Sequence, residues 1–432
     1  LTSNRHTEDA VTNAIFMPLD DDVATSTMSV IEKSVSGPSM TSATWTYTYE
    51  NDDGPSGSSS SDRTNWTKVD APEGHFTYYH AWVSEPLAGK LIRKETRNSA
   101  SGSLLRAENY TYQSENSIGK SYILTYPGPG DLERPVHTVK VTTTQSGDTY
   151  TAAYGFNINH NASNYSYSRP VSQSVKSNVS SGVRSTITHF GHNKANWILS
   201  LPVKQTVNGR VTSEKVFDSK GRLTSEKRNR ALYATYGYHT NGNLAWVRDA
   251  DSRMTQAASC KRGVPQHIRR ADGKSTYQNV DSFGRTTSLK DARGYTTLYS
   301  RDAMGRLLVV NPTGSWKNTV HSYSFSGNPR HTISRGGART TIEYDAMFRP
   351  IFIETRDMVI GESSYVRYNY DAAGREVFVS VPSLSPNSSA GTTSKYDGLS
   401  RLIEQRETVF PYATIKQSYH GSHRHTIKDA DG

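Results

Sequence analysis

The chain has 432 residues with a formal net charge of +10, and only 34% of them are hydrophobic, while glycine (32) and tyrosine (26) are abundant. This balance favours many short strands joined by glycine-containing turns over helices around one aliphatic core. No apolar run approaches the roughly 18–20 residues of a membrane-spanning helix, and one cysteine excludes both a disulfide framework and a cysteine-rich zinc site.

Residues 1–72 are expected to form an N-terminal β region. The alternation of threonine with aromatic residues over residues 44–49 indicates a strand, and residues 51–61 form a Gly/Ser-rich loop. The acidic run at residues 20–22 lacks the alternating carboxylates and the glycine of a calcium-binding loop, so no metal is assigned to it. The sequence begins with leucine and shows no signal peptide, and it ends at residues 429–432 inside an apparent turn. We therefore interpret it as an internal piece of a longer protein.

Residues 73–200 are expected to contain diverged β-hairpins, since residues 73–79 and 89–95 resemble weak copies of the pattern that follows. Charge separates this part of the chain from the rest. Residues 1–200 hold 16 Lys/Arg against 19 Asp/Glu, whereas residues 201–432 hold 34 against 21. A basic surface could attract nucleic acid, anionic glycans or an acidic enclosed cargo. Arginine is also a regular residue of the repeat, however, so we do not expect nucleic-acid binding.

Residues 201–432 contain a repeat: an aromatic residue, Asp, two variable residues, Gly, Arg and an apolar residue. Its Asp position, or the equivalent, falls at residues 218, 239, 281, 302, 324, 345, 371 and 397, in steps of 21, 42, 21, 22, 21, 26 and 26. The step of 42 is two periods, with an eroded copy near residues 260–263 at its midpoint. A register held over this length predicts a tandem array.

Each residue of the motif suits a hairpin turn. The aromatic residue ends a strand, Asp hydrogen-bonds nearby backbone amides, Gly accepts a positive φ, and Arg can pair with an Asp or stack on an aromatic ring of the next hairpin. The predicted structural turn residues are Asp218, Gly221, Arg222, Asp281, Gly284, Arg285, Asp302, Gly305, Arg306, Tyr344, Asp345, Tyr370, Asp371, Gly374, Arg375, Tyr396, Asp397 and Arg401.

A second turn half a period later, as at residues 271–273, 290–294 and 335–337, divides each repeat into two strands. Successive hairpins must stack, because one hairpin alone is marginally stable. We therefore predict an all-β fold of tandem β-hairpins in one antiparallel sheet, and a sheet of this length must coil or close because strands twist with one hand.

The repeated motif resembles the YD repeats of the Rhs family, which also occur in the B and C components of bacterial Tc toxins and in teneurins. The resemblance covers residues 201–432 and extends more weakly to residues 73–200. It implies a secreted or cell-surface protein whose spiralling β-shell encloses a C-terminal effector polypeptide of the same parent chain. The Asp-Pro pair that ends the bacterial shells is absent, so cleavage and effector activity are not carried over to this segment.

No catalytic, cofactor or metal site is assigned. An aspartate at every turn indicates a structural role, because a glycoside hydrolase needs a single pair of catalytic carboxylates and not many equivalent ones. Cys260 has no evident His or Asn partner, and His423 and His425 share a strand face with no third ligand evident beyond nearby His420. Two functions remain open: a structural shell, or a surface scaffold whose tyrosines bind carbohydrate. We expect most tyrosines to pack between hairpins instead.

Overall fold

The computed structural model describes residues 11–19, 23–50, 64–81, 90–112, 138–157, 169–409, 412–420 and 423–429. Over these residues it contains 32 β-strands and one short 3-10 turn, η2 (Lys194–Asn196). No helix in the described part of the chain is long and apolar enough to cross a membrane. The predicted all-β fold is confirmed.

The strands before the regular repeats are β1 (Val11–Leu19), β2 (Val23–Val35), β3 (Ala43–Tyr49), β4 (Thr64–Ala71), β5 (Gly74–Ala81), β6 (Leu91–Arg97), β7 (Leu104–Tyr112), β8 (Thr138–Gln145), β9 (Asp148–Gly155), β10 (Ser172–Ser177), β11 (Arg184–Asn193) and β12 (Ile198–Val207). Those of the first repeats are β13 (Arg210–Phe217), β14 (Leu223–Arg228), β15 (Ala231–Tyr238), β16 (Leu244–Asp249), β17 (Met254–Ala258), β18 (His267–Arg269), β19 (Ser275–Val280), β20 (Thr286–Lys290), β21 (Thr296–Arg301) and β22 (Leu307–Pro312). The last are β23 (Thr319–Ser324), β24 (Arg330–Arg335), β25 (Ala338–Tyr344), β26 (Pro350–Asp357), β27 (Ser363–Tyr370), β28 (Glu376–Ser380), β29 (Gly391–Tyr396), β30 (Leu402–Glu407), β31 (Thr414–His420) and β32 (His423–Asp429).

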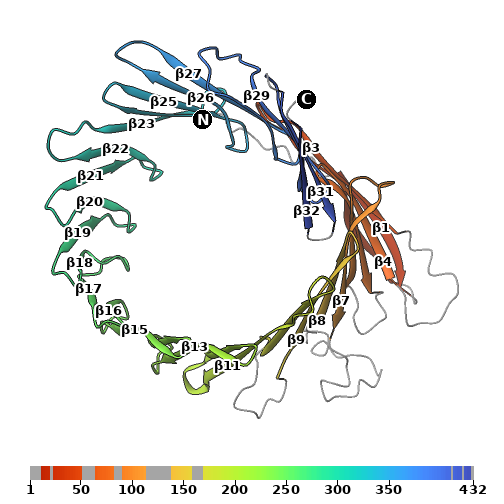
Figure 1. The fold of residues 1–432 in the computed structure, drawn as a ribbon, viewed down its shortest axis with the longest axis horizontal. Coiled ribbons are helices and arrows are strands. Elements are labelled where there is room, and N and C mark those ends of the chain that lie inside the picture. Colours follow the sequence, from red (N-terminus) through yellow and green to blue (C-terminus); the bar gives the residue numbers. More distant parts are fainter. Residues whose placement is uncertain are drawn as a thin grey trace.

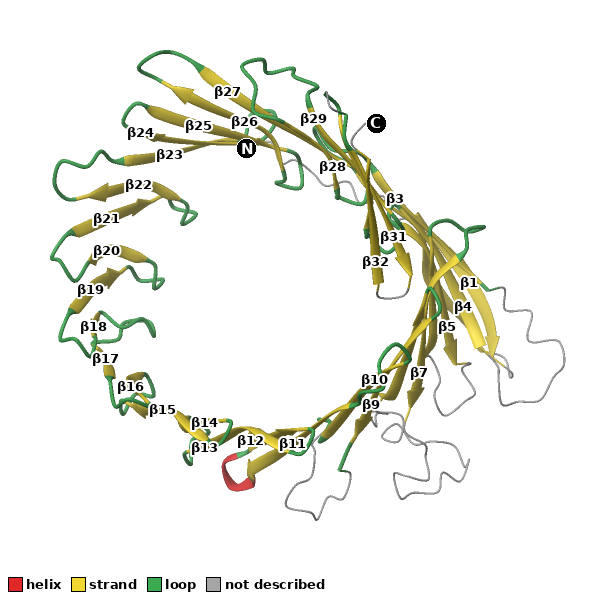
Figure 2. Cartoon of the chain, in the orientation of Figure 1, coloured by secondary structure: helices red, strands yellow, loops and turns green. Residues whose placement is uncertain are grey.

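Every described strand pairs antiparallel with the strand that follows it in sequence, from β1 to β32. The result is one long meander in which each hairpin lies against its neighbours (Figure 2). The sheet runs through both predicted region boundaries, 72/73 between β4 and β5 and 200/201 within β12. The division of the chain into regions 1–72, 73–200 and 201–432 stays a prediction.

The sheet curls round until the turns of its last strands contact the edge of its first strands, so that the ribbon follows a ring (Figure 1). A recurring irregularity accounts for part of this curvature. The pairing register shifts just before the turn that joins an odd-numbered strand to the next even-numbered one, as at Val216/Phe217, Asn369/Tyr370 and Lys395/Tyr396. Such a bulge bends the strand and increases its twist. Because the shift recurs on one edge of the sheet, the bends add together.

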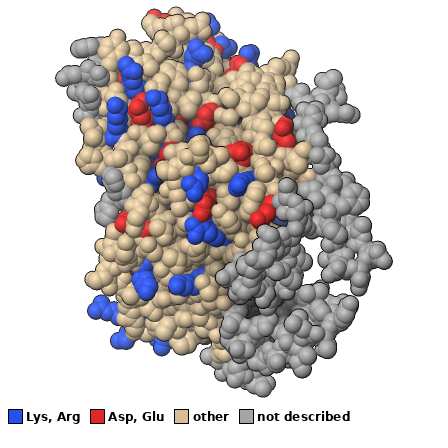
Figure 3. All heavy atoms as spheres, turned by 90° about the vertical axis from the view of Figure 1, so that its right-hand side faces the viewer, with Lys and Arg blue, Asp and Glu red and all other residues tan. Residues whose placement is uncertain are grey.

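A single curved layer leaves little room for an aliphatic core. Among the described residues, the buried hydrophobic side chains are mostly small and include Ala43, Ala107 and Ala234. Buried polar and charged groups accompany them, and Asp345 is 0% exposed. Lysines, arginines and acidic residues are interspersed over the face that bears the first strands, with no broad patch of one sign (Figure 3). Ladder hydrogen bonds and polar contacts at the turns must therefore carry much of the stability.

Opposite edges of the sheet meet where the ring closes, and we call this contact the seam. The β2–β3 turn accepts a hydrogen bond at Pro38 O from the N–H of Ala346 in the β25–β26 turn, at 3.1 Å. The β6–β7 turn accepts one at Asn98 Oδ1 from the N–H of Gly398 in the β29–β30 turn, at 2.6 Å. The turns with the repeated Asp residues lie on one edge of the sheet. At the seam they contact the opposite edge of the sheet, at the β2–β3 and β6–β7 turns.

The seam should open when Gly398 gains a side chain. A Cβ at this position would lie 2.6 Å from the carbonyl oxygen of Arg97, and that backbone cannot move aside without parting the two turns. We expect Gly398→Val to increase the radius of gyration measured by small-angle X-ray scattering. The exposed Gly182, where a Cβ would meet no atom closer than 3.5 Å, provides the control Gly182→Val. Equal radii for the two variants would contradict the closed ring.

Candidate structural site at the repeat turns

The turns that carry the repeated Asp share one backbone form. In the turn of residues 302–306, the N–H of Asp302 donates to the carbonyl of Arg306 at 3.0 Å, and the N–H of Gly305 donates to the carbonyl of Asp302 at 2.9 Å. The same pair of bonds occurs in the turns that begin at Asp218, Asp281, Asp345, Asp371 and Asp397. The sequence motif therefore places six turns with the same backbone hydrogen bonds on one edge of the sheet.

In each of these turns the aspartate and arginine side chains join, and we call this pair the clasp. Asp302 Oδ1 accepts the backbone N–H of Arg306 at 2.8 Å, while Oδ2 accepts Nε of the same arginine at 2.6 Å. The other five pairs repeat both bonds: Asp218–Arg222, Asp281–Arg285, Asp345–Arg349, Asp371–Arg375 and Asp397–Arg401. Charge-assisted hydrogen bonds of this length are the strong ones, so the clasp fixes the turn.

The fourth residue of each clasped turn has a positive φ. Four of these residues are glycines, Gly221, Gly284, Gly305 and Gly374, with φ between 77° and 86°. Phe348 and Ser400 occupy the same position in the other two turns, with φ of 58° and 56°. Glycine adopts this backbone without steric cost, whereas the Cβ of Phe348 or Ser400 is strained there. The Phe348 side chain is 64% exposed, so its ring adds no clash with the interior.

The clasp arginine also reaches the next hairpin. The guanidinium of Arg349 lies 4.5 Å from the ring centre of Tyr370, and the Tyr370 hydroxyl donates back to the carbonyl of Pro350 at 2.9 Å. Burial raises the pKa of Tyr370, so its hydroxyl stays protonated and can donate. The same arginine–tyrosine link occurs in Arg222–Tyr238, Arg306–Tyr323, Arg375–Tyr396 and Arg401–Tyr419. These five tyrosines are held between hairpins.

The link is interrupted where the sequence departs from the motif. Arg301 replaces the expected aromatic residue after the Asp281 turn, and the Arg285 guanidinium lies over the Phe283 ring of its own turn, 4.8 Å away. Tyr344 follows a hairpin without a clasp arginine, and burial raises its pKa as well. The eroded copy at residues 260–263 forms a shorter turn, in which Lys261 and Val264 exchange backbone hydrogen bonds. No carboxylate is present there to form a clasp.

A further clasp lies on the opposite edge, where sequence reasoning missed it. Asp249 Oδ1 accepts the N–H of Arg253 at 2.9 Å and Oδ2 accepts its Nε at 2.8 Å. The Asp and Arg four residues apart were a visible signal, but Ser252 replaces glycine and the pair falls out of the 21-residue register. The turn at Asp291 has the backbone bonds alone, because Tyr295 occupies the position of the arginine.

Three candidate histidines, His420, His423 and His425, belong to the β31–β32 hairpin. His420 pairs with His423 across the β31–β32 hairpin, and His425 pairs with Ser418. No group of three or more His, Cys, Asp or Glu side chains able to hold a metal is found within the described ranges. Cys260 is a half-buried free cysteine. The acidic run at residues 20–22 lies outside the described residues.

One comparison with known proteins agrees with the sequence motif. Residues 280–315, which contain the Asp281 and Asp302 clasps, match the family model described as RHS Repeat, so the predicted resemblance is confirmed. No curated protein is similar enough in sequence to give a match.

Similar solved structures include one described as the crystal structure of TcdB2-TccC3-TEV, with 13% identity, a TM-score of 0.47 and coverage of 98% of this chain and 25% of that one. TcdB2-TccC3 without its hypervariable C-terminal region gives 11% identity, a TM-score of 0.42 and coverage of 97% and 30%. The Tc holotoxin pore of Photorhabdus luminescens with the TccC3 mutation D651A gives 10% identity and a TM-score of 0.39, with coverage of 94% of this chain and 29% of that one. The chain thus spans less than a third of the length of these chains.

Removing a buried clasp should lower the free energy of unfolding far more than removing a turn aspartate that has no arginine partner. Asp345→Ala leaves Arg349 without its partner in a site where the carboxylate is 0% exposed, so we expect a loss of about 3–5 kcal/mol in the free energy of unfolding. Asp291→Ala removes only backbone hydrogen bonds at an exposed turn and should cost about 1 kcal/mol. Urea unfolding followed by circular dichroism measures both values. Similar losses in the two variants would refute the clasp as a stabilising pair.

The clasp at Asp218 should make stability depend on pH in the acid range. Hydrogen bonds from the backbone and side chain of Arg222 lower the pKa of Asp218 below its ordinary value of 3.8. A lowered pKa in the folded state gives stabilisation that is present above the unfolded pKa and is lost as the pH falls through the folded one. The difference in melting temperature between the wild-type chain and Asp218→Asn should therefore stay constant down to about pH 5 and shrink below about pH 4. A difference that does not change over this range would contradict the assignment.

Proposed function

We propose that this chain is a structural shell segment of a secreted or cell-surface Rhs-type protein, since residues 280–315 match the RHS Repeat family model. Its ring of hairpins encloses an effector polypeptide that belongs to the same parent chain. The segment itself acts as a wall and carries out no reaction.

The closed seam is the observation that carries this proposal. Thr41 Oγ1 donates to the carbonyl of Tyr370 at 3.0 Å, and Asn328 Nδ2 donates to Ser39 Oγ at 2.7 Å, so the β2–β3 turn is bonded to hairpins about 290–330 residues away in sequence. An open ribbon of hairpins could not retain a cargo. A ribbon whose opposite edges bond to each other forms a continuous wall.

The state of the repeated carboxylates supports a structural role over glycoside hydrolysis. In the six clasps of the repeat turns both carboxylate oxygens accept hydrogen bonds from the arginine four residues on. In four of these turns Oδ1 also accepts the backbone N–H two residues on. A hydrolytic acid and base must instead face a substrate, one of them protonated. The clasped aspartates are equivalent and already paired.

A scaffold that binds carbohydrate is the second proposal, and exposed aromatic rings favour it. Trp197 is 78% exposed, Trp316 67% and Tyr295 61%, and none of the three takes part in the arginine–tyrosine links. A glycan array probed with the full chain decides this point. Saturable binding that is lost in Trp316→Ala supports the scaffold, and an array without saturable binding removes it.

Protection of a fused polypeptide tests the shell. With a protease-sensitive reporter joined after Gly432, we expect the reporter to resist a protease concentration that degrades it when free. Gly398→Val, which parts the seam, should restore cleavage, while Gly182→Val should not. A reporter cleaved at the same rate in the wild-type fusion as when free would show that the ring does not enclose it.

A further inference from the structure

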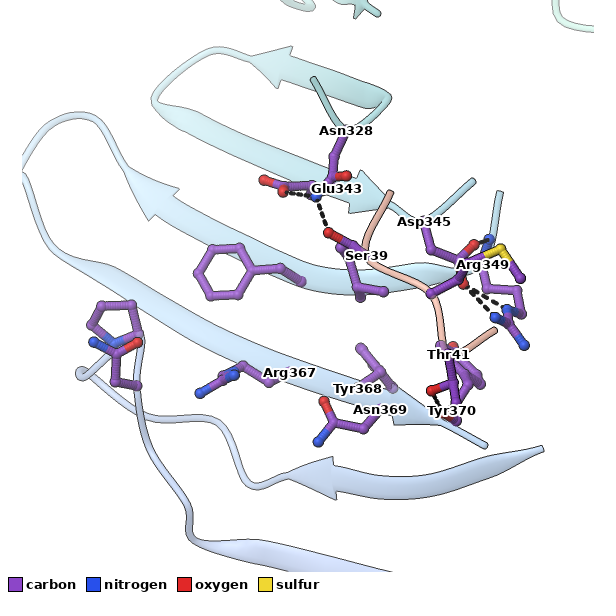
Figure 4. A pocket seen from close by; sticks show the side chains of 15 residues that line it. Ser39, Thr41, Asn328, Glu343, Asp345, Arg349, Arg367, Tyr368, Asn369 and Tyr370 are labelled. Carbon is purple, nitrogen blue, oxygen red and sulfur yellow. Dashed lines mark hydrogen bonds and ion pairs between the residues drawn. The ribbon is translucent and has the colours of Figure 1, made fainter. Parts of the chain in front are cut away.

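A pocket of about 670 Å³ lies at the seam, within the size range of ligand-binding sites (Figure 4). One wall is the β2–β3 turn at residues 39–41, the floor is formed by β25, β26 and β27, and Pro386 and Asn387 of the β28–β29 connection complete the lining. This connection is anchored to β27, because Tyr365 and Ser383 exchange backbone hydrogen bonds at 2.8 and 3.1 Å. The pocket is therefore built from both ends of the curled sheet.

The two carboxylates in the pocket are already neutralised. Glu343 accepts hydrogen bonds from Asn328 Nδ2 at 2.7 Å and from Arg330 Nε at 2.9 Å. Asp345 is held in its clasp by Arg349. Neither is left to attract a cation.

Arg367 supplies the unbalanced charge of the pocket. Its backbone N–H donates to Ser380 Oγ, but among the described residues its guanidinium has no hydrogen bond, ion pair or ring contact. Figure 4 shows Arg367 and Asn369 along β27, across the pocket from Asn328 and Glu343. A guanidinium presents a planar fork of donors that matches a carboxylate, so an anionic partner suits this position.

The neighbouring groups suit a peptide. The side-chain amides of Asn369 and Asn387 have no partner among the described residues and offer both donors and acceptors. Phe352, the cross-strand partner of Arg367, stacks on Tyr365 with ring centres 5.5 Å apart and provides an apolar surface beside the charge. A cation, two amides and an aromatic ring match a carboxylate side chain with its flanking peptide groups.

We propose that the seam pocket binds an acidic segment of polypeptide. Arg367 pairs with a carboxylate of that segment, and Asn369 and Asn387 bond its peptide groups. The identity of the ligand as polypeptide rests on the proposed shell function, and the basic surplus of residues 201–432 (34 Lys/Arg against 21 Asp/Glu) favours an acidic partner. Because both ends of the sheet line the pocket, an occupied pocket stabilises the closed ring over the open one.

The test is a titration of the full chain with the labelled peptide acetyl-Gly-Glu-Gly-Glu-Gly-amide, followed by fluorescence anisotropy. We expect saturable binding that weakens at least about tenfold when glutamine replaces both glutamates, and by a similar factor in Arg367→Gln. Arg269→Gln removes the same charge from the exposed surface of β18 and should leave binding unchanged. Circular dichroism verifies that both variants remain folded, as expected from the absence of a described partner for the Arg367 guanidinium.

Three outcomes would overturn the inference: equal binding of the charged and neutral peptides, equal loss in the two arginine variants, or displacement of the peptide by glucuronate at concentrations at which acetate has no effect. The last would assign the site to an acidic sugar. If the fused reporter remains protected while the peptide does not bind, the shell stands and the pocket assignment alone fails. If the peptide binds but the reporter is cleaved, the pocket assignment stands and the shell proposal fails.

Discussion

The Asp–Arg clasp is the interaction on which the rest of this structure depends. A one-layer sheet cannot bury large apolar side chains on both faces, so the geometry of each hairpin must be fixed at its turns. In each clasp a carboxylate ties the backbone and the side chain of the same arginine, as Asp302 does with Arg306. The arginine of five clasps then lies against the tyrosine of the next hairpin. One short motif thus sets both the turn and the spacing between hairpins.

Curvature follows from the same motif. The residue before the clasp aspartate is where the strand register shifts, as at Glu343/Tyr344 and Ser300/Arg301. The bulge and the clasp therefore occupy one edge of the sheet together, and repetition converts a local bend into a ring. At the seam, the same turns meet the opposite edge, where Ala346 and Gly398 donate their N–H groups. The motif that stabilises each turn therefore also forms the turns that bond across the seam.

Much of this fold could be predicted from the sequence, because the determining contacts are local. The distance of four residues from Asp to Arg, the glycine between them and the 21-residue period all belong to single hairpins, and they predict hairpin after hairpin without knowledge of distant segments. The clasp at Asp249 escaped prediction because Ser252 adopts the positive φ that glycine was expected to supply. The seam could not be predicted, since it joins residues such as Asn98 and Gly398 that share no pattern. The pocket escaped for the same reason, because it joins residues 39–41 to β25, β26 and β27, which lie far away in the sequence.

The central claim is that the sheet closes on itself through its own turns. The most direct measurement is the distance between spin labels at Ser101 in the β6–β7 turn and Leu399 in the β29–β30 turn, recorded by pulsed dipolar spectroscopy in a Cys260→Ser background. A closed seam predicts one short distance with a narrow distribution. A long or broad distribution would mean that the hairpins form an open arc in solution, and the account of this molecule as a wall would then be wrong.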